Sequence, residues 1–244
     1  MTYCVAMSLA QGLVFVSDSR TNAGVDHISV FRKLHVFGVP GERLIVLQSA
    51  GNLATSQSVI SLLRQRLDGV GEHLHNVPSL FAAATLVGDT LREVLAHDES
   101  ATLNQGIELG CSFLLGGQIH GQAPALYNLY PQGNFITSSE DTPYFQIGES
   151  KYGKPILDRA LSYQTPLELA LRCALISFDS TIRSNLSVGM PLDLLVYKTD
   201  SFEVPSGFRV REGDAYFEGI RQQWCGGLST LLGQLAEAPG DYWV

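Results

Sequence analysis

Large apolar side chains occupy every second position at the start of the chain. In residues 2–9 they fall at the odd positions from Tyr3 to Leu9, and smaller residues alternate with them. A period of two is typical of a β-strand. Gln11-Gly12 then predicts a turn, and the apolar run at residues 13–16 predicts a second strand. The opening pattern therefore indicates a β-hairpin.

The next part of the chain predicts two more strands and then two helices. Residues 33–39 and 43–48 are strand candidates separated by a short turn. After Gly51 the spacing between apolar residues changes to that of a helix. The apolar positions of this first predicted helix are Val59, Ile60, Leu62, Leu63 and Leu67. Pro78 suits the first turn of a second helix, which the pattern extends to Leu95.

The second half of the chain repeats this order. Four strands are predicted, near residues 111–115, 125–130, 144–147 and 192–197. Between the last two of these strands, a helix is predicted at residues 150–161. Another follows Thr165, which we expect to be its N-cap, with Pro166 at the first helical position.

Strand runs and helix runs are therefore segregated along the chain. Residues 96–110 and 203–214 are predicted polar loops, and Gly226-Gly227 is predicted to break any single helix near the C-terminus. Segregated runs point to an α+β architecture in packed layers. Since no repeat or linker interrupts the pattern, we expect a single domain over residues 1–244.

Composition narrows the class of protein. Of the 244 residues, 45% are hydrophobic and 16% are charged, which is typical of a globular chain. A net charge of −8 without a basic cluster argues against nucleic acids and anionic membranes as partners. No apolar run approaches the roughly 18 residues that span a bilayer, and no export signal is evident. We therefore expect a cytoplasmic protein.

Cysteine and histidine spacing gives no indication of a metal site. Cys4, Cys111, Cys173 and Cys225 are far apart, so free thiols are expected rather than disulfides or a zinc site. The pair His73 and His75 lies in a polar segment, where loop residues are expected. No phosphate-binding glycine motif and no GxSxG motif occurs. We predict no metal and no cofactor.

Thr2 is a candidate nucleophile if Met1 is removed, as a small second residue normally permits. Its hydroxyl would then share a residue with a free α-amine, which supplies a general base. The ordinary pKa of that amine, about 7.7–8.0, suits catalysis near neutral pH. The predicted hairpin returns Asp18 to the side of Thr2, and Lys33 opens the next strand.

Asp18 and Lys33 have two interpretations. In the first, the Lys33 ammonium lowers the energy of a Thr2 alkoxide, and Asp18 holds Lys33 in place and balances its charge. In the second, Asp18 caps a turn and Lys33 is a solvated strand end, because most charged residues lie on protein surfaces.

Three segments resemble a known family. GLVFVSDSRTNAG (residues 12–24), Ser49-Ala50-Gly51 and IRSNLSVGMPLDLLVY (residues 182–197) resemble N-terminal-nucleophile hydrolases of the proteasome β-subunit type. Within that superfamily, the segments TYCVAM, NAGVDHI and IRSNLSVG are most similar to Anbu, the bacterial ancestral β subunit. The resemblance covers nearly the whole chain.

The resemblance implies a fold, a partner and a site. The fold is a four-layer αββα sandwich, and the partners are copies of the same chain in a ring-like or open helical homo-oligomer. By this resemblance, Thr2 takes the place of the nucleophile. Asp18 and Lys33 take the place of the supporting ion pair. Gly51 takes the place of the residue whose backbone N–H forms the oxyanion hole. A peptide or protein substrate and threonine-type peptidase activity follow as expectations.

The residues expected around Thr2 depart from the family pattern at two places. Gly148-Glu149-Ser150 stands where the family has Gly-Ser-Gly, and Ser184 stands where an aspartate often follows arginine. Ser150, Ser184 and Ser187 remain candidates for supporting roles. Two alternatives to a peptidase stay open: hydrolysis of a non-protein amide, and a catalytically weak oligomeric scaffold, which the changed positions favour.

Overall fold

A computed structural model describes residues 2–22, 28–101 and 108–243 of the chain. Contacts divide the chain into two compact units, residues 1–212 and residues 213–244. Met1 and most of the NAGVDHI segment lie outside the described residues. Among the helices that the structure describes, none has the length and apolar character needed to span a membrane.

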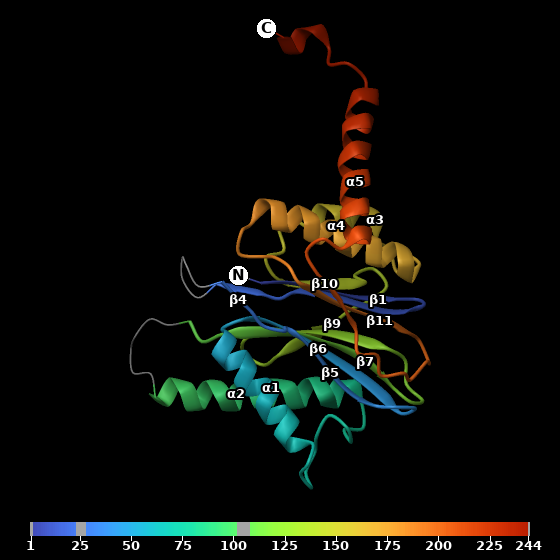
Figure 1. The fold of residues 1–244 in the computed structure, drawn as a ribbon. Helices are drawn as coiled ribbons and strands as arrows, with labels where there is room; N and C mark the ends of the chain where they lie inside the picture. Colours follow the sequence, from blue (N-terminus) through green and yellow to red (C-terminus); the bar gives the residue numbers. More distant parts are fainter. Residues whose placement is uncertain (1, 23–27, 102–107, 244) are drawn as a thin grey trace. The chain divides into compact units, whose positions relative to one another are not determined.

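The first unit contains two antiparallel five-stranded sheets stacked face to face (Figure 1). The first sheet has the order β10-β1-β2-β11-β12. Its strands in chain order are β1 (Tyr3–Leu9), β2 (Gly12–Asp18), β10 (Tyr144–Gly148), β11 (Leu192–Lys198) and β12 (Phe208–Val210). The second sheet has the order β5-β6-β7-β8-β9. Its strands are β5 (Leu34–Val39), β6 (Arg43–Gly51), β7 (Cys111–Ile119), β8 (Ala125–Leu129) and β9 (Phe135–Thr137).

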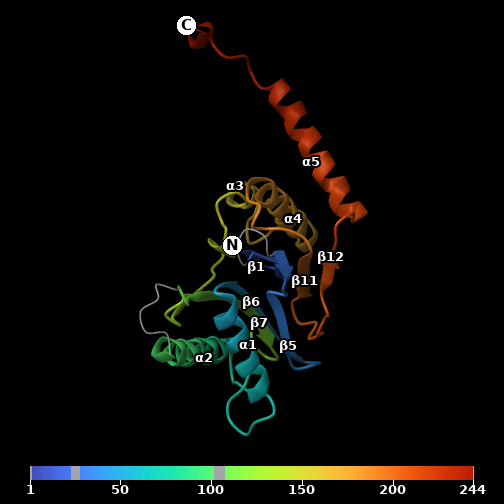
Figure 2. The same cartoon turned by 60° about the vertical axis from the view of Figure 1, so that its left-hand side comes forward.

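Helices cover the outer face of each sheet, as Figures 1 and 2 show. Helices α1 (Leu53–Arg66) and α2 (Leu80–Ala101) cover the second sheet. Helices α3 (Lys154–Ala160) and α4 (Leu167–Ser184) cover the first sheet. A separate two-stranded ribbon pairs β3 (Arg20–Asn22) with β4 (Ile28–Val30). The predicted α+β architecture and the four-layer αββα sandwich are confirmed.

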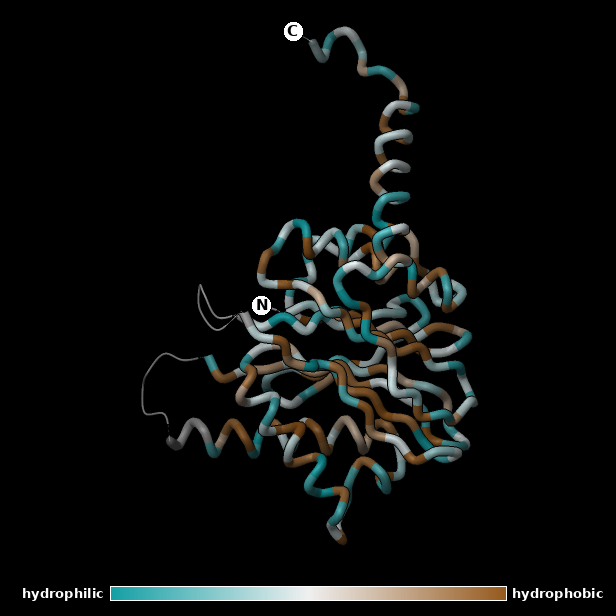
Figure 3. The backbone as a smooth tube through the Cα atoms, in the orientation of Figure 1, coloured by the Kyte–Doolittle hydropathy of each residue, from teal (hydrophilic) through white to brown (hydrophobic). Residues whose placement is uncertain are grey.

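Two hydrophobic layers hold the sandwich together. Between the sheets lie buried side chains from both, including Ala6, Phe15, Val46, Leu114 and Ile147. Between the second sheet and its helices lie Ile45, Leu47, Val59, Leu63 and Val87, among others. Figure 3 shows that apolar residues concentrate in the stacked strands. Strands β1 and β2 are buried along almost their whole length because helices cover one face and a sheet the other.

Four sequence predictions were wrong at the level of element ends. Helix α2 continues to Ala101, so the predicted loop at 96–110 begins later. Strand β12 lies inside the predicted loop at 203–214. Pro166, not Thr165, occupies the N-cap of α4, and the Thr165 hydroxyl accepts a hydrogen bond from Ser162 N at 2.9 Å. The helix predicted at 150–161 is shorter, as α3.

The second unit contains one long helix, α5 (Ala215–Gln234), and a short 3-10 helix, η1 (Gly240–Trp243). The prediction that Gly226-Gly227 would break a helix was wrong. A glycine keeps its backbone N–H, so it weakens a helix by only about 1 kcal/mol relative to alanine. Asp214 caps the start of α5, where its carboxylate accepts a hydrogen bond from Phe217 N at 2.9 Å.

The described cysteines are all free. Cys4, Cys111 and Cys173 are buried, whereas Cys225 is exposed in α5. Burial raises the pKa of the Cys111 thiol to about 12. The prediction of free thiols is confirmed, although one of them lies on the surface.

Candidate functional site

The predicted hairpin brings the end of β2 to the start of β1. Cys4 pairs with Ser17, so Asp18 lies beside Tyr3 at the open end of the hairpin. The Tyr3 backbone N–H donates a hydrogen bond to Asp18 Oδ1 at 3.1 Å. Thr2 directly precedes this contact and is almost fully buried. The hairpin register therefore fixes the position of Thr2 relative to Asp18.

Lys33 and Asp18 form a buried ion pair. Lys33 Nζ lies 2.6 Å from Asp18 Oδ1, and the two side chains are only 5% and 0% exposed. Lys33 Nζ also donates to the Arg20 carbonyl oxygen at 2.7 Å. Burial raises the pKa of the Asp18 carboxyl, while the Lys33 ammonium and backbone donors oppose that shift. The interpretation of Lys33 as a solvated strand end was wrong, because burial of a charge requires such pairing.

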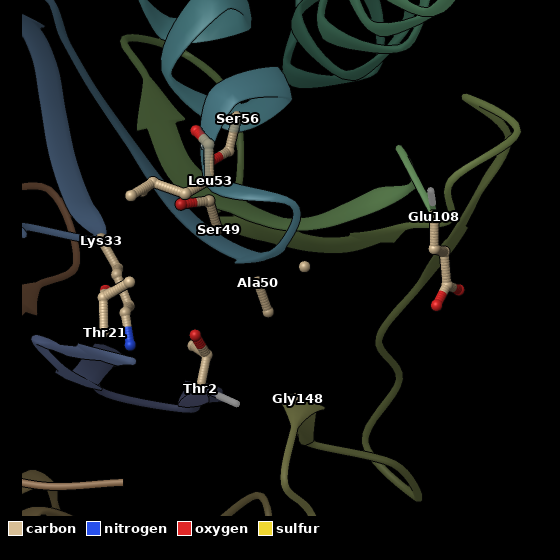
Figure 4. Close-up of a pocket in the computed structure, with 10 residues that line it drawn as sticks. Thr2, Thr21, Lys33, Ser49, Ala50, Leu53, Ser56, Glu108 and Gly148 are labelled. Carbon is tan, nitrogen blue, oxygen red and sulfur yellow. Dashed lines mark hydrogen bonds between the residues drawn. The ribbon is translucent and has the colours of Figure 1, made fainter. Parts of the chain in front are cut away.

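Thr2 and Lys33 open onto one cavity of about 620 Å³. Ser49, Ala50 and Gly51, at the end of β6, also line this cavity. Figure 4 shows Ser49 and Ala50 on the side that faces Thr2. The cavity therefore lies between the two sheets, with the hydroxyl of Thr2 exposed to it from the first sheet.

Gly51 has a backbone that only glycine adopts readily. Its φ is +112°, and a Cβ atom would lie 2.6 Å from the Gly110 carbonyl oxygen. Ser49 N donates to the Lys33 carbonyl oxygen at 3.0 Å, and successive N–H groups of a strand point to opposite sides. The Gly51 N–H therefore points, like that of Ser49, to the side of β6 on which Lys33 lies.

The start of α1 adds to this wall of the cavity. Asn52 is its N-cap, and Asn52 Oδ1 accepts a hydrogen bond from Thr55 N at 3.1 Å. The N-terminus of a helix carries partial positive charge. A developing anion near Gly51 would be stabilised by that charge in addition to the backbone N–H.

Comparison with solved structures identifies the relatives of this chain. The helical assembly of the Anbu complex from Pseudomonas aeruginosa matches with a TM-score of 0.95 and 64% identity, over 98% of this chain and 99% of that chain. The chain belongs to the Anbu family. Anbu from Yersinia bercovieri matches with a TM-score of 0.92 and 58% identity, over 97% of this chain and 98% of that chain.

A more distant Anbu structure keeps the same fold. The Anbu (Gly-1) mutant from Hyphomicrobium sp. strain MC1 matches with a TM-score of 0.91 and 46% identity, over 98% of this chain and 100% of that chain. No protein-family model matches the chain, and neither does any curated protein sequence. The family predicted from the sequence segments is thus confirmed by full-length structural likeness.

The turn after β10 contacts Thr2 in this Anbu chain. Glu149 N donates to the Thr2 carbonyl oxygen at 2.6 Å. Gly148 has a φ of +82°, and a Cβ atom there would lie 1.9 Å from the same oxygen. Asn185 Nδ2 donates to Glu149 Oε2 at 3.0 Å, which ties this turn to the segment after α4. Sequence reasoning missed Asn185, although the Gly-Glu-Ser departure marked the turn.

The three serines predicted to support the site, Ser150, Ser184 and Ser187, do not line the described wall of the cavity. Ser184 is exposed at the end of α4. Ser187 donates its backbone N–H to Asn185 Oδ1 at 2.9 Å, and the Ser150 carbonyl oxygen accepts from Lys154 N at 3.3 Å. Backbone groups of these serines thus take part in the surrounding turns, and their supporting roles remain predictions.

Hydrogen bonds from two other parts of the chain stabilise the segments next to Thr2 and Asp18. Gly189 N donates to Asp18 Oδ2 at 3.4 Å, and Arg20 Nη1 donates to the Leu186 carbonyl oxygen at 3.1 Å. On the other side, the Tyr3 hydroxyl lies 2.6 Å from Ser177 Oγ, and burial raises the pKa of Tyr3. The segment after α4 therefore supports the ion pair, and α4 itself supports β1.

Within the described residues, no group of three or more histidine, cysteine, aspartate or glutamate side chains could hold a metal ion. His73 and His75 lie in the segment between α1 and α2, and His73 Nδ1 accepts a hydrogen bond from His75 N at 3.2 Å. That bond occupies one of the two ring nitrogens that could bind a metal ion.

Proposed function

We propose that this Anbu protein is a threonine amidohydrolase that cleaves peptide bonds once Met1 has been removed. The observation that carries the proposal is the meeting of Thr2, the buried Lys33–Asp18 pair and the Gly51 backbone at one cavity. These groups supply a nucleophile, a fixed cation and an oxyanion donor. Full-length likeness to other Anbu structures supports the fold that this arrangement requires.

The α-amine of a mature Thr2 would act as the general base. It takes the hydroxyl proton while Thr2 Oγ attacks the substrate carbonyl, and the Gly51 N–H receives the oxyanion. The α-ammonium then gives its proton to the leaving amine, which leaves an acyl-enzyme on Thr2 Oγ. Water then attacks this ester while the α-amine takes one of its protons. The bond to Thr2 Oγ breaks, Oγ receives that proton from the α-ammonium, and the free acid departs.

Lys33 supports the nucleophile by charge. Its ammonium is fixed in a buried position, where it interacts more strongly with a developing Thr2 alkoxide than it would in water. The same cation lowers the pKa of a nearby α-amine, which keeps more of that amine in its basic form near neutral pH. Asp18 compensates the charge of Lys33 and holds it in place.

Two measurements test this proposal: the identity of the N-terminal residue and the reaction of Thr2 with a covalent probe. Intact-mass spectrometry determines whether Met1 is absent, and a peptide epoxyketone is then incubated with the mature protein. We expect one adduct per chain on Thr2 and no adduct on Thr2→Ala, whose peptidase activity falls by at least about a hundredfold, since the nucleophile is lost. Undiminished turnover in Thr2→Ala, or a mature chain that stays unlabelled, would contradict the proposal.

We also propose that the chain self-assembles. A helical assembly is described for the Pseudomonas aeruginosa relative, which is 64% identical over nearly its full length. Exposed apolar side chains along α5 in this chain support the proposal. A single domain over residues 1–244, a cytoplasmic location and peptides rather than other amides as substrates stay predictions.

A further inference from the structure

The cavity at Thr2 contains one positive and one negative side chain on its described wall. Lys33 is already paired with Asp18 at 2.6 Å. Glu108 lies on the opposite side of the cavity from Lys33 and Thr2 (Figure 4). Among the residues that the structure describes, none forms an ion pair or hydrogen bond with the Glu108 carboxylate. Among the described side chains that line the cavity, the uncompensated charge is therefore negative.

The remaining wall does not cancel this charge. Thr21, Ser49 and Ser56 contribute hydroxyl-bearing side chains, and Leu53 contributes an aliphatic one. Hydroxyl groups can hydrogen-bond a substrate of either charge, so they set no preference of their own. The charge preference of the cavity thus depends on Glu108.

The backbone of Glu108 is fixed to the wall that bears Gly51. Asn52 Nδ2 donates to the Glu108 carbonyl oxygen at 3.1 Å. Asn52 N donates to the Gly110 carbonyl oxygen at 3.0 Å, and Asn52 also caps α1. A substrate whose carbonyl oxygen accepts from the Gly51 N–H would therefore lie along the wall to which Glu108 is fixed.

We infer that Glu108 is a specificity-determining residue that selects substrates with a positively charged side chain, of the lysine or arginine type. The inference rests on the proposed function. The inference assigns this cationic side chain to the acyl part of the substrate, which stays bound to Thr2 in the acyl-enzyme. An exposed pair of opposite charges gives a preference of about twofold to fivefold, which salt reduces.

The test compares matched probes on the mature protein. Tripeptide epoxyketones carry lysine or norleucine at each of the three positions in turn, and the labelling rate of Thr2 is measured for each. We expect a lysine-to-norleucine rate ratio above about two at one position at least. That ratio falls to about one in Glu108→Gln and in high salt. Glu140→Gln, which removes an exposed glutamate outside the cavity, keeps the wild-type ratio.

A second measurement does not depend on chemistry at Thr2. Fluorescence anisotropy gives the affinity of Thr2→Ala for unreactive peptides with lysine or norleucine, with and without Glu108→Gln. Equal rates or equal affinities for the two side chains at every position would overturn the inference, even where labelling succeeds. If no probe labels Thr2, the proposed function fails, and the peptide affinities alone then decide the role of Glu108.

Discussion

At the scale of single residues, the Lys33–Asp18 pair places two charged groups in the interior of the fold, where each is costly without the other. Both side chains are buried, so each depends on the other to offset its loss of water. We predict that Asp18→Asn lowers the free energy of unfolding by about 3–5 kcal/mol, because it leaves the Lys33 ammonium buried without a counter-charge. Urea denaturation at neutral pH measures this loss.

The exposed pair of Lys154 and Asp158 is a matched control. Their side chains lie 2.8 Å apart but are 54% and 47% exposed, so water already stabilises both charges. Asp158→Asn should therefore cost no more than about 1 kcal/mol. If Asp18→Asn and Asp158→Asn lower the free energy of unfolding equally, burial of Lys33 does not explain the effect of Asp18→Asn.

At the scale of elements, the turn after β10 fixes the backbone of Thr2. Gly148 has a left-handed φ of +82°, and an alanine Cβ there would lie 1.9 Å from the Thr2 carbonyl oxygen. We predict that Gly148→Ala displaces Thr2 or separates β10 from β1, with a loss of more than about 2 kcal/mol in unfolding free energy. Labelling of mature Thr2 by an epoxyketone should slow as well.

Gly121 is a control that has the left-handed backbone of Gly148 without its close contact. It has a similar φ of +80°, but a Cβ atom there would meet nothing within 4 Å. Gly121→Ala should therefore show only the conformational cost of a left-handed alanine, about 1–2 kcal/mol, with unchanged labelling of Thr2. If both variants label at the wild-type rate, contact with Gly148 does not position Thr2.

At the scale of the whole molecule, α5 presents an apolar stripe. Its members recur at spacings of three or four, and they are the exposed residues Trp224, Leu228 and Leu231. A stripe exposed in the single chain suits burial against another copy. We predict that the double variant Leu228→Lys/Leu231→Lys reduces the assembly to smaller species, as measured by sedimentation velocity at fixed concentration.

The opposite face of α5 provides the control for added charge. Gln222→Lys/Ser229→Lys adds the same two charges about a third of a turn or more away from the stripe. This control should keep the mass of the wild-type assembly, and circular dichroism should show that both variants keep their helices. A Leu228→Lys/Leu231→Lys protein with unchanged mass would show that the stripe does not hold copies together.

The sequence by itself determined the elements and the centre of the site. Alternating and helical periods are local properties, so they predicted most strands and helices of the two sheets and their covering layers. A hairpin joins neighbouring segments, which is why the approach of Asp18 to Thr2 could be predicted. The ion pair of Asp18 with Lys33 was one of two interpretations of the sequence, and the tertiary structure decided between them, because Lys33 precedes a strand of the other sheet.

Only the tertiary structure decided the rest of the site. Glu108 and Asn185 are separated from Thr2 by more than 100 residues of chain, and no local pattern brings them together. The supporting roles of Ser150, Ser184 and Ser187 stay predictions, and none of the three is among the residues that line the described wall of the cavity. Periodicity reports which face of an element is buried, whereas the identity of the groups facing Thr2 depends on how distant turns pack.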